Sequence, residues 1–232
     1  MALKVTDFSY TLKKQHKKTV TKVIFFILLY FFIINFILTF LIFPVRQLSS
    51  SMQPNIMESS CLMVTPLLKT PDRGDIVLLK ARSQTKEGFF KKILNKTIAF
   101  FTAQQIFLNE MQDSPCVKNE LRRVVGLPGD TIYMRDYILY ICPENEKYFL
   151  TEFEVSPKKY SVAFFTPPST WDTSIGVSGS FEKFTLKDDE YFLLGDNRKS
   201  CDDSRLWGPV KLSSIKAKAL FTYFPFTNLK LY

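Results

Sequence analysis

The stretch RRVVGLPGDTIYM, from Arg122 to Met134, contains two short apolar runs of strand-like composition with a Pro-Gly-Asp turn signal between them. Runs of the same kind recur along the chain and are separated by Pro, Gly, Asp and Asn. This pattern predicts a mainly β fold. The predicted strands are CLMV (61–64), DIVLL (75–79), RRVVGL (122–127), DTIYM (130–134), YILYI (137–141), KYFL (147–150), YSVAFF (160–165), EYFLL (190–194) and AKALFTYF (217–224).

A long apolar segment precedes these strands. Residues 23–43, VIFFILLYFFIINFILTFLIF, carry no charge, and a helix of this length is about 31 Å long, which matches the hydrocarbon core of a bilayer. The segment ends in Phe-Pro-Val-Arg, without the small residues of a signal-peptide cleavage site. We therefore predict a transmembrane helix. The chain of 232 residues, 46% of them hydrophobic, is long enough for one main domain beside this helix.

The charge of the chain is concentrated before the apolar segment. The formal net charge is +9, and residues 1–22 hold six lysines and one aspartate, a net charge of +5. Because this basic tail runs directly into the span, anionic lipid explains it better than nucleic acid does. The excess of lysines before the span places the N-terminus in the cytoplasm. We expect a basic cytoplasmic tail (1–22), a single-pass helix (23–43) in the inner, cytoplasmic membrane, and an extracytoplasmic domain (44–232).

Residues 86–108, KEGFFKKILNKTIAFFTAQQIFL, interrupt the strand-like pattern. Their apolar residues recur at helical spacing, and four lysines cluster in the first half. Two interpretations remain open. The segment is either a helix packed on the β core or an amphipathic helix in the membrane interface.

Cysteine and histidine usage limits the chemistry of the outer domain. Its four cysteines allow three disulfide pairings in an oxidising compartment, or free thiols: Cys61, Cys116, Cys142 and Cys201. The single histidine, His16, precedes the span, and there is no Cys-x-x-Cys. This excludes a His-based triad and a His-ligated zinc site from the outer domain, and no cofactor is implied.

Four sequence blocks follow the predicted anchor. Each one alone is compatible with an ordinary turn, whereas their combination and order are specific. Together they resemble the type I signal peptidase family, and the resemblance covers the anchor and about half of the outer domain. The blocks are SSSMQP (49–54), RGDIV (73–77), RRVVGLPGD (122–130), and GDNR (195–198) continuing to DSR (203–205) and WG (207–208).

The resemblance implies a core of antiparallel β-sheets and an endopeptidase that removes signal peptides from exported preproteins. The family cuts after small side chains at the first and third positions before the scissile bond. Ser51 in Ser-x-Ser-Met-x-Pro matches the family's nucleophile. Ser49 matches the hydroxyl that stabilises the oxyanion together with the backbone N–H of Ser51.

Two positions differ from the family pattern. The family's general base is a neutral lysine directly before the arginine of the third block, and Arg122 occupies that position here. A guanidinium group does not release its proton in proteins, so Arg122 cannot be a general base in the same manner. The family commonly has a serine where this chain has Cys201. Asp203 and Arg205 match an acidic and basic pair that supports the site, in the block that Gly195 opens.

Other groups could supply the missing base. The candidates are Lys118, Lys80, a lysine of residues 86–96, or a Cys201 thiolate favoured by the charge of Arg122. The alternative is a catalytically silent homologue that binds preproteins or acts as an accessory subunit. A plain interaction module at the membrane surface is favoured only if the block matches are coincidental. The expected partners are signal-peptide-bearing preproteins and the lipid bilayer.

Overall fold

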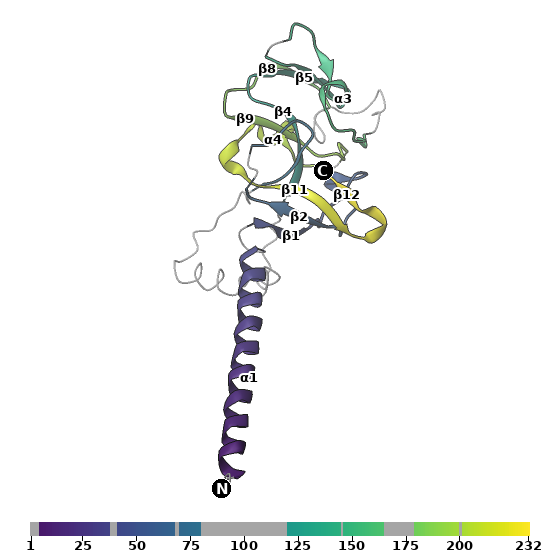
Figure 1. Ribbon diagram of the computed structural model, residues 1–232. Coiled ribbons are helices and arrows are strands. Elements are labelled where there is room, and N and C mark those ends of the chain that lie inside the picture. The colour runs from purple at the N-terminus through teal and green to yellow at the C-terminus, as the bar shows by residue number, and fades with distance from the viewer. Residues whose placement is uncertain are drawn as a thin grey trace, which may run out of the picture.

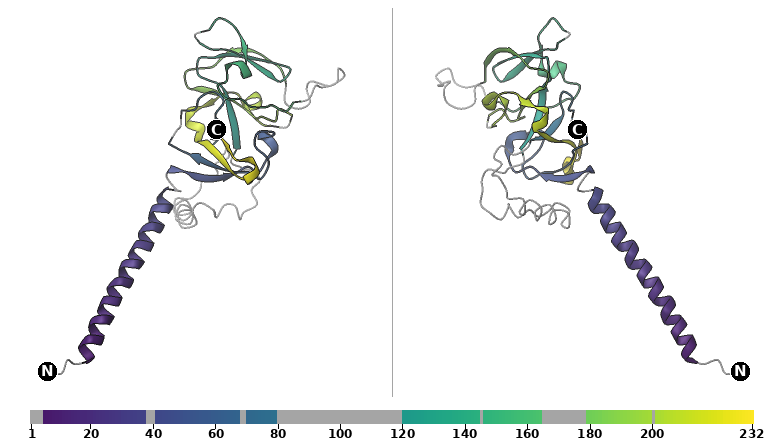
Figure 2. Two further views of the ribbon diagram at one scale, coloured as in Figure 1. Left: turned by 45° about the vertical axis from the view of Figure 1, so that its right-hand side comes forward. Right: turned by 90° about the vertical axis from the view of Figure 1, so that its left-hand side faces the viewer.

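The computed structural model of the chain describes residues 5–37, 41–67, 70–79, 120–144, 146–164, 179–199 and 201–232. A long helix, α1 (Val5–Phe36), extends away from a domain made of two antiparallel β-sheets, as Figures 1 and 2 show. The predicted mainly β fold with an N-terminal apolar helix is therefore confirmed. The predicted helical segment 86–108 lies outside the described residues.

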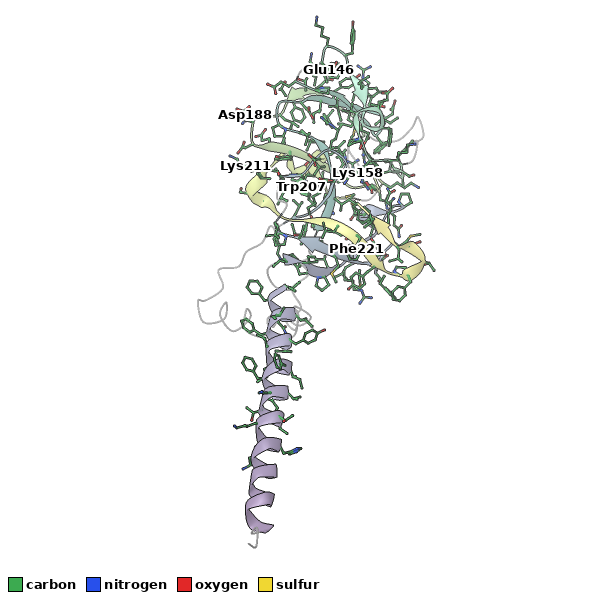
Figure 3. All side chains as sticks on the ribbon, in the orientation of Figure 1. Glu146, Lys158, Asp188, Trp207, Lys211 and Phe221 are labelled. Atoms are coloured by element: carbon green, nitrogen blue, oxygen red, sulfur yellow. The ribbon has the colours of Figure 1, made fainter. Side chains whose placement is uncertain are left out.

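Helix α1 is long and apolar enough between His16 and Phe36 to cross a membrane. Its large apolar side chains are mostly exposed, and Figure 3 shows them projecting from the helix at a distance from the β domain. In water such a surface would be unfavourable, since each apolar side chain left exposed forgoes about 1.5 to 3 kcal/mol of burial. Lipid is the solvent that suits this helix.

The C-terminal end of the predicted span differs from the structure. The backbone N–H of Ile42 donates to the C=O of Ile37 (3.0 Å), five residues earlier, which is a wider turn than the α-helical one. Phe43 then begins strand β1 (Phe43–Arg46) and is buried in the core of the domain. The assignment of Phe43 to the span was wrong because an apolar residue suits lipid and a protein core equally well.

The larger sheet has the strand order β1-β2-β11-β3-β4-β9-β10, and β12 pairs with β11. All of these neighbours are antiparallel. The central strands are buried, and the sheet encloses two apolar clusters. The remaining strands of this sheet are β2 (Cys61–Thr65), β3 (Ile76–Leu79), β4 (Glu120–Gly126), β9 (Glu190–Leu194), β10 (Val210–Lys211), β11 (Ile215–Phe224) and β12 (Lys230–Leu231).

The smaller sheet lies at the end of the domain farthest from α1 (Figures 1 and 2). Its order is β7-β6-β5-β8, and it packs on a separate apolar cluster that includes Val125 and Phe192 of the larger sheet. Its strands are β5 (Thr131–Arg135), β6 (Ile138–Cys142), β7 (Leu150–Thr151) and β8 (Phe181–Thr185). The short helical elements are α3 (Glu152–Val155), α4 (Ser204–Trp207) and the 3₁₀ turns η2 (Ser50–Met52), η3 (Leu212–Ser214) and η4 (Phe226–Asn228).

Most of the predicted strands are found, but YSVAFF is not one. Among its described residues only Ala163 makes a bridge, an isolated one with Asn197. The backbone of Ala163 is taken by the loop after β9, because its N–H donates to Asp196 O (2.8 Å) and its C=O accepts from Arg198 N (2.7 Å). Of KYFL, only Leu150 lies in a strand, and strands β1 and β8 were not predicted.

Candidate active site

Ser51 lies in the turn η2, between strands β1 and β2. Its neighbour Met52 is fully buried in the apolar core. The loop after β9 holds the same turn from the other side, since the N–H of Asn197 donates to Ser51 O (2.9 Å) and Asn197 Nδ2 donates to Ser50 O (3.2 Å). The hydroxyl of Ser51 therefore stands on a turn that the buried side chain of Met52 and the loop after β9 hold in place.

Three polar groups surround the hydroxyl of Ser51, which is only 4% exposed. Ser49 Oγ lies 2.9 Å from Ser51 Oγ, Gln47 Nε2 donates to Ser51 Oγ at 3.1 Å, and Arg122 Nη1 donates to it at 3.2 Å. The structure thus brings together Ser49, Ser51 and Arg122, which the sequence predicts to share one site.

Arg122 enters this site from β4, near the middle of the larger sheet. Its guanidinium group donates to Asp202 O from Nε (2.8 Å) and Nη2 (2.5 Å), and to Leu121 O from Nη1 (2.7 Å). Glu120 lies 3.4 Å away and is partly exposed. Trp207 lies under the guanidinium carbon, whose distance to the ring centroid is 6.0 Å. A cation is therefore fixed beside the hydroxyl of Ser51.

The guanidinium group at this position can donate hydrogen bonds but cannot accept a proton. It therefore favours a negatively charged oxygen at Ser51 through its charge, without being able to create one by proton abstraction. Among the described residues, Ser51 Oγ has hydrogen bonds with Gln47, Ser49 and Arg122, and none of these is an amine. The lysine candidates Lys80, Lys118 and those of residues 86–96 lie outside the described residues.

The surroundings of Cys201 disfavour a thiolate, which was one of the candidates for the base. Cys201 is 3% exposed, and burial raises the pKa of its thiol to about 12, although the charge of Arg122 acts in the opposite direction. The thiol is therefore protonated at neutral pH and donates weakly to Asp202 O (3.6 Å). Cys61, Cys142 and Cys201 are free thiols, and Cys116 lies outside the described residues.

Gly195 and the pair of Asp203 and Arg205 hold the loop after β9 against the site. A Cβ on Gly195 would overlap both Cys201 Sγ and the backbone oxygen of Ser51, so only glycine fits there. Asp203 forms a buried ion pair with Arg205 (2.8 Å) and accepts a hydrogen bond from Gly195 N (3.1 Å). Arg205 Nη1 also donates to Arg198 O (3.2 Å).

Two further buried ion pairs, which the sequence does not predict, support the loop. Arg123 binds Asp196 (2.6 Å), which also accepts from Asn55 (2.9 Å). Arg198 binds Glu152 (2.6 Å), the first residue of α3 in the smaller sheet region. The partners of the two ion pairs are 73 and 46 residues apart in the chain, and no local sequence pattern connects them.

Gln47 is the site residue for which the sequence carried no signal. It lies in the short link between the predicted span and the serines, and a single polar residue in a linker belongs to no motif or periodic pattern. Its burial, with 1% of the residue exposed, becomes apparent only when β1 pairs with β2.

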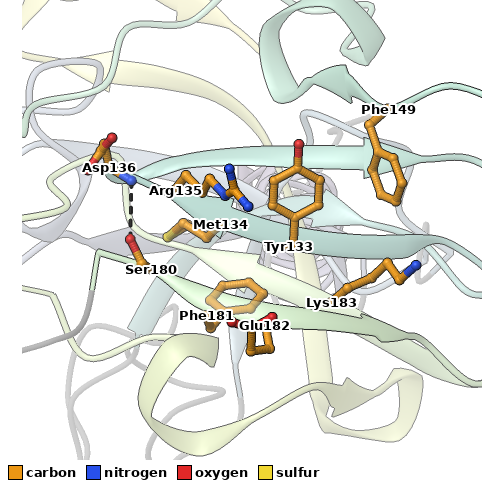
Figure 4. Close-up of a pocket in the computed structure, with 9 residues that line it drawn as sticks. All are labelled: Tyr133, Met134, Arg135, Asp136, Phe149, Ser180, Phe181, Glu182 and Lys183. Atoms are coloured by element: carbon orange, nitrogen blue, oxygen red, sulfur yellow. Dashed lines mark hydrogen bonds between the residues drawn. The ribbon is translucent and has the colours of Figure 1, made fainter.

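A separate pocket lies on the smaller sheet, as Figure 4 shows. Its lining contains none of the predicted site residues, and the hydrogen bond drawn in it joins Asp136 N to Ser180 Oγ (3.3 Å). Its lining combines apolar or aromatic residues with charged ones. The first group is Tyr133, Met134, Phe149 and Phe181, and the second is Arg135, Asp136, Glu182 and Lys183. It holds no cluster of catalytic side chains.

Comparison with known proteins identifies the family. The model of the family described as "Signal peptidase, peptidase S26" matches residues 20–224. The chain belongs to the signal peptidase family. Signal peptidase I enzymes are serine endopeptidases that remove signal peptides from preproteins, and the resemblance inferred from the four sequence blocks is confirmed.

Relatives of this signal peptidase cover most of its length. Signal peptidase I P of Bacillus subtilis subsp. natto is 28% identical over 196 residues, which are 83% of this chain and 82% of that protein. Signal peptidase I of Aquifex aeolicus is 27% identical over 194 residues, 76% of this chain and 73% of that protein. A crystal structure of a signal peptidase I from Enterococcus faecalis is 24% identical, with a TM-score of 0.31, and covers 64% of this chain and 96% of that one.

Proposed function

We propose that this signal peptidase cleaves exported preproteins with Ser51 as nucleophile, and that Ser49 O–H and the backbone N–H of Ser51 stabilise the oxyanion. The observation that carries the proposal is the 2.9 Å separation of the two hydroxyl oxygens in a turn fixed by Met52 and Asn197. Each fixed donor at a developing oxyanion lowers the activation free energy by roughly 3 to 4 kcal/mol. The substrates have small residues at the first and third positions before the cut.

The reaction proceeds without a lysine base in this proposal. Hydroxide from solvent takes the hydrogen of Ser51 and becomes water, and the resulting alkoxide is stabilised by the charge of Arg122. The alkoxide attacks the scissile carbonyl carbon and forms a tetrahedral oxyanion. The tetrahedral oxyanion then breaks down: the scissile C–N bond breaks, and the leaving nitrogen takes a proton from water to become the amino terminus of the mature protein. A second water molecule hydrolyses the ester that links the signal peptide to Ser51. Turnover is therefore slow at neutral pH and depends on hydroxide.

Membrane attachment explains why a slow catalyst suffices for this substrate. We propose that α1 spans the membrane with its basic end in the cytoplasm, so that the β domain lies at the outer surface. A preprotein's apolar segment lies in the same bilayer, and its cleavage site emerges close to Ser51. Tethering both partners to one surface raises the effective concentration of the cleavage site.

A second candidate function follows from Arg122. Because a permanently charged donor occupies the position of the base, the protein could instead bind preproteins without cutting them, as a silent homologue or accessory subunit. The fold and the rigid turn around Ser51 would then serve recognition alone.

One experiment separates the two functions. The full chain is purified in detergent and offered a preprotein with an Ala-x-Ala site, beside Ser51→Ala and the matched control Ser50→Ala. We expect slow cleavage by the natural chain and by Ser50→Ala and none by Ser51→Ala. Equal residual cleavage by all three proteins would refute Ser51 as nucleophile. Binding of the preprotein without cleavage by any of them would support the silent homologue.

A further inference from the structure

Gln47 is a buried polar residue next to the reacting hydroxyls, and no role has been assigned to it so far. Its backbone is held at both ends, since its N–H donates to Ser60 O (2.8 Å) and its C=O accepts from Ser59 N (2.7 Å). Its side-chain nitrogen donates to Ser49 O (2.9 Å), Ser49 Oγ (3.1 Å) and Ser51 Oγ (3.1 Å). One amide group thus contacts both hydroxyls of the site.

The orientation of this amide follows from its partners. The backbone oxygen of Ser49 can only accept a hydrogen bond, so the side-chain atom of Gln47 that lies 2.9 Å from it must be the nitrogen. The nitrogen has two hydrogens for three acceptors, and one hydrogen is shared between neighbouring oxygens. Gln47 is therefore a donor to both serines.

The direction of the hydroxyl hydrogens follows in turn. A serine hydroxyl accepts two hydrogen bonds and donates one. Ser51 Oγ accepts from Gln47 and from Arg122, so its own hydrogen points to Ser49 Oγ. Ser49 Oγ then accepts from Ser51 and from Gln47, and its own hydrogen points away from both. The side chain of Ser49 does not cap the turn η2 either.

We propose that Gln47 is a positioning residue that fixes these hydrogen directions and leaves the O–H of Ser49 to the oxyanion of the substrate. The inference rests on the proposed function, because it gives Ser49 the oxyanion role. Without the amide donor, the hydroxyl of Ser49 could donate its hydrogen to Ser51 Oγ instead. The oxyanion would then lose a preoriented donor. The preorganisation of such donors is what makes them effective.

The contact itself is tested by a double-mutant cycle on unfolding. The full chain, Gln47→Met, Ser49→Ala and the double variant are unfolded by urea in detergent and followed by tryptophan fluorescence. Methionine nearly preserves the shape of glutamine without the amide. We expect the effects on the unfolding equilibrium constant to be coupled by about fivefold, as for one hydrogen bond. Additive effects would overturn the inference whether or not the chain cleaves preproteins.

The role in the reaction is tested by kinetics on the same four proteins. Gln47→Met should lower kcat by about tenfold with KM unchanged. The same change should have little effect in the Ser49→Ala background, because the hydroxyl whose hydrogen Gln47 directs is then absent. The matched control is Thr222→Val, which removes a buried hydrogen bond to Tyr232 (2.8 Å) in β11 and should leave kcat unchanged.

The outcomes separate the two proposals. An unchanged kcat in Gln47→Met, with coupling present in unfolding, would overturn the positioning role. If the natural chain cleaves no preprotein while the unfolding cycle shows coupling, the proposed cleavage fails and the contact of Gln47 with the serines stands.

Discussion

Replacing Arg122 by lysine should produce a less stable but faster peptidase. An extended lysine ends near the place where Arg122 holds its guanidinium group, 3.2 Å from Ser51 Oγ. Unlike the guanidinium group, an amine in an apolar site can lose its proton and then accept the hydrogen of the serine. A positioned general base contributes about 10² to 10⁴ to the rate. We therefore expect Arg122→Lys to cleave at least about 100-fold faster than the natural chain near pH 8.

The cost in stability follows from the hydrogen bonds of Arg122. Its guanidinium group donates twice to Asp202 O and once to Leu121 O, at distances between 2.5 and 2.8 Å. A single amine nitrogen preserves some of these bonds but not all. Bonds from a charged donor contribute about 1.5 to 3 kcal/mol each. Because water and the amine compensate in part, we expect a loss of about 2 to 3 kcal/mol in the free energy of unfolding.

The assay combines both measurements on one preparation. Cleavage of an Ala-x-Ala preprotein is followed over pH 6 to 10 for the natural chain, for Arg122→Lys, and for Arg122→Lys combined with Ser51→Ala. Urea unfolding in detergent confirms that each variant is folded. The reasoning is refuted if Arg122→Lys is folded and cleaves no faster than the natural chain. A slower rate would mean that the guanidinium group itself performs a step.

The remaining predictions concern pH, the thiol and the loop after β9. Cleavage by the natural chain should rise about tenfold per pH unit from pH 7 to 9 if hydroxide removes the hydrogen of Ser51, and a plateau in this range would reveal a base in the protein. Since burial raises the pKa of Cys201 to about 12, only about one thiol in 10⁴ is ionised at pH 8, so iodoacetamide should alkylate Cys201 at least about 10³-fold more slowly in the folded chain than in urea. The same raised pKa means that the unfolded chain loses this proton first, so the free energy of unfolding should fall as pH rises above about 9, with Cys201 contributing at most about 1.4 kcal/mol per pH unit. The fall between about pH 9 and 10 should be smaller in Cys201→Ser, and an equal fall would contradict the raised pKa of this thiol. Gly195→Ala should destabilise the folded chain by about 1 to 3 kcal/mol, because the added methyl group overlaps Cys201 Sγ and Ser51 O; an unchanged urea midpoint would contradict the close approach. Glu152→Gln should cost about 3 to 5 kcal/mol, since it leaves Arg198 buried without its partner, and a smaller loss in urea unfolding would show that water replaces the carboxylate.

The sequence predicted the strands whose apolar runs are bounded by turn residues, and it failed where composition is ambiguous. Phe43 is as apolar as the span before it, so only its pairing in β1 identifies it as a core residue. In strand β8, FEKFT, the two phenylalanines are three residues apart, so the apolar residues do not alternate as they do in a typical strand, although both pack against the apolar cluster of the smaller sheet. In YSVAFF the composition is that of a strand, but the backbone of Ala163 is taken by the loop after β9.

For the candidate site, the sequence indicated the residues of the motifs but not the contacts that hold them. Ser49, Ser51 and Arg122 were predicted to share a site from a family resemblance, and they do lie together. The contacts that fix the site join residues distant in the chain, such as Asn197 to Ser51 and Arg122 to Asp202, and these depend on the order of strands in the sheet. No local pattern encodes that order, so Gln47 could not be recognised before the structure.

Arg122 and Cys201 donate to the same backbone oxygen. The backbone oxygen of Asp202 accepts from Nε and Nη2 of Arg122, and Cys201 Sγ donates weakly to the same oxygen. A guanidinium group has five N–H donors, and the carbonyl groups of Asp202 and Leu121 accept three hydrogen bonds from it. A guanidinium group buried here without partners would cost several kcal/mol. Here the charge has fixed partners on β4 and on the loop after β9. The guanidinium group of Arg122 is therefore held beside Ser51 by acceptors that the fold itself provides.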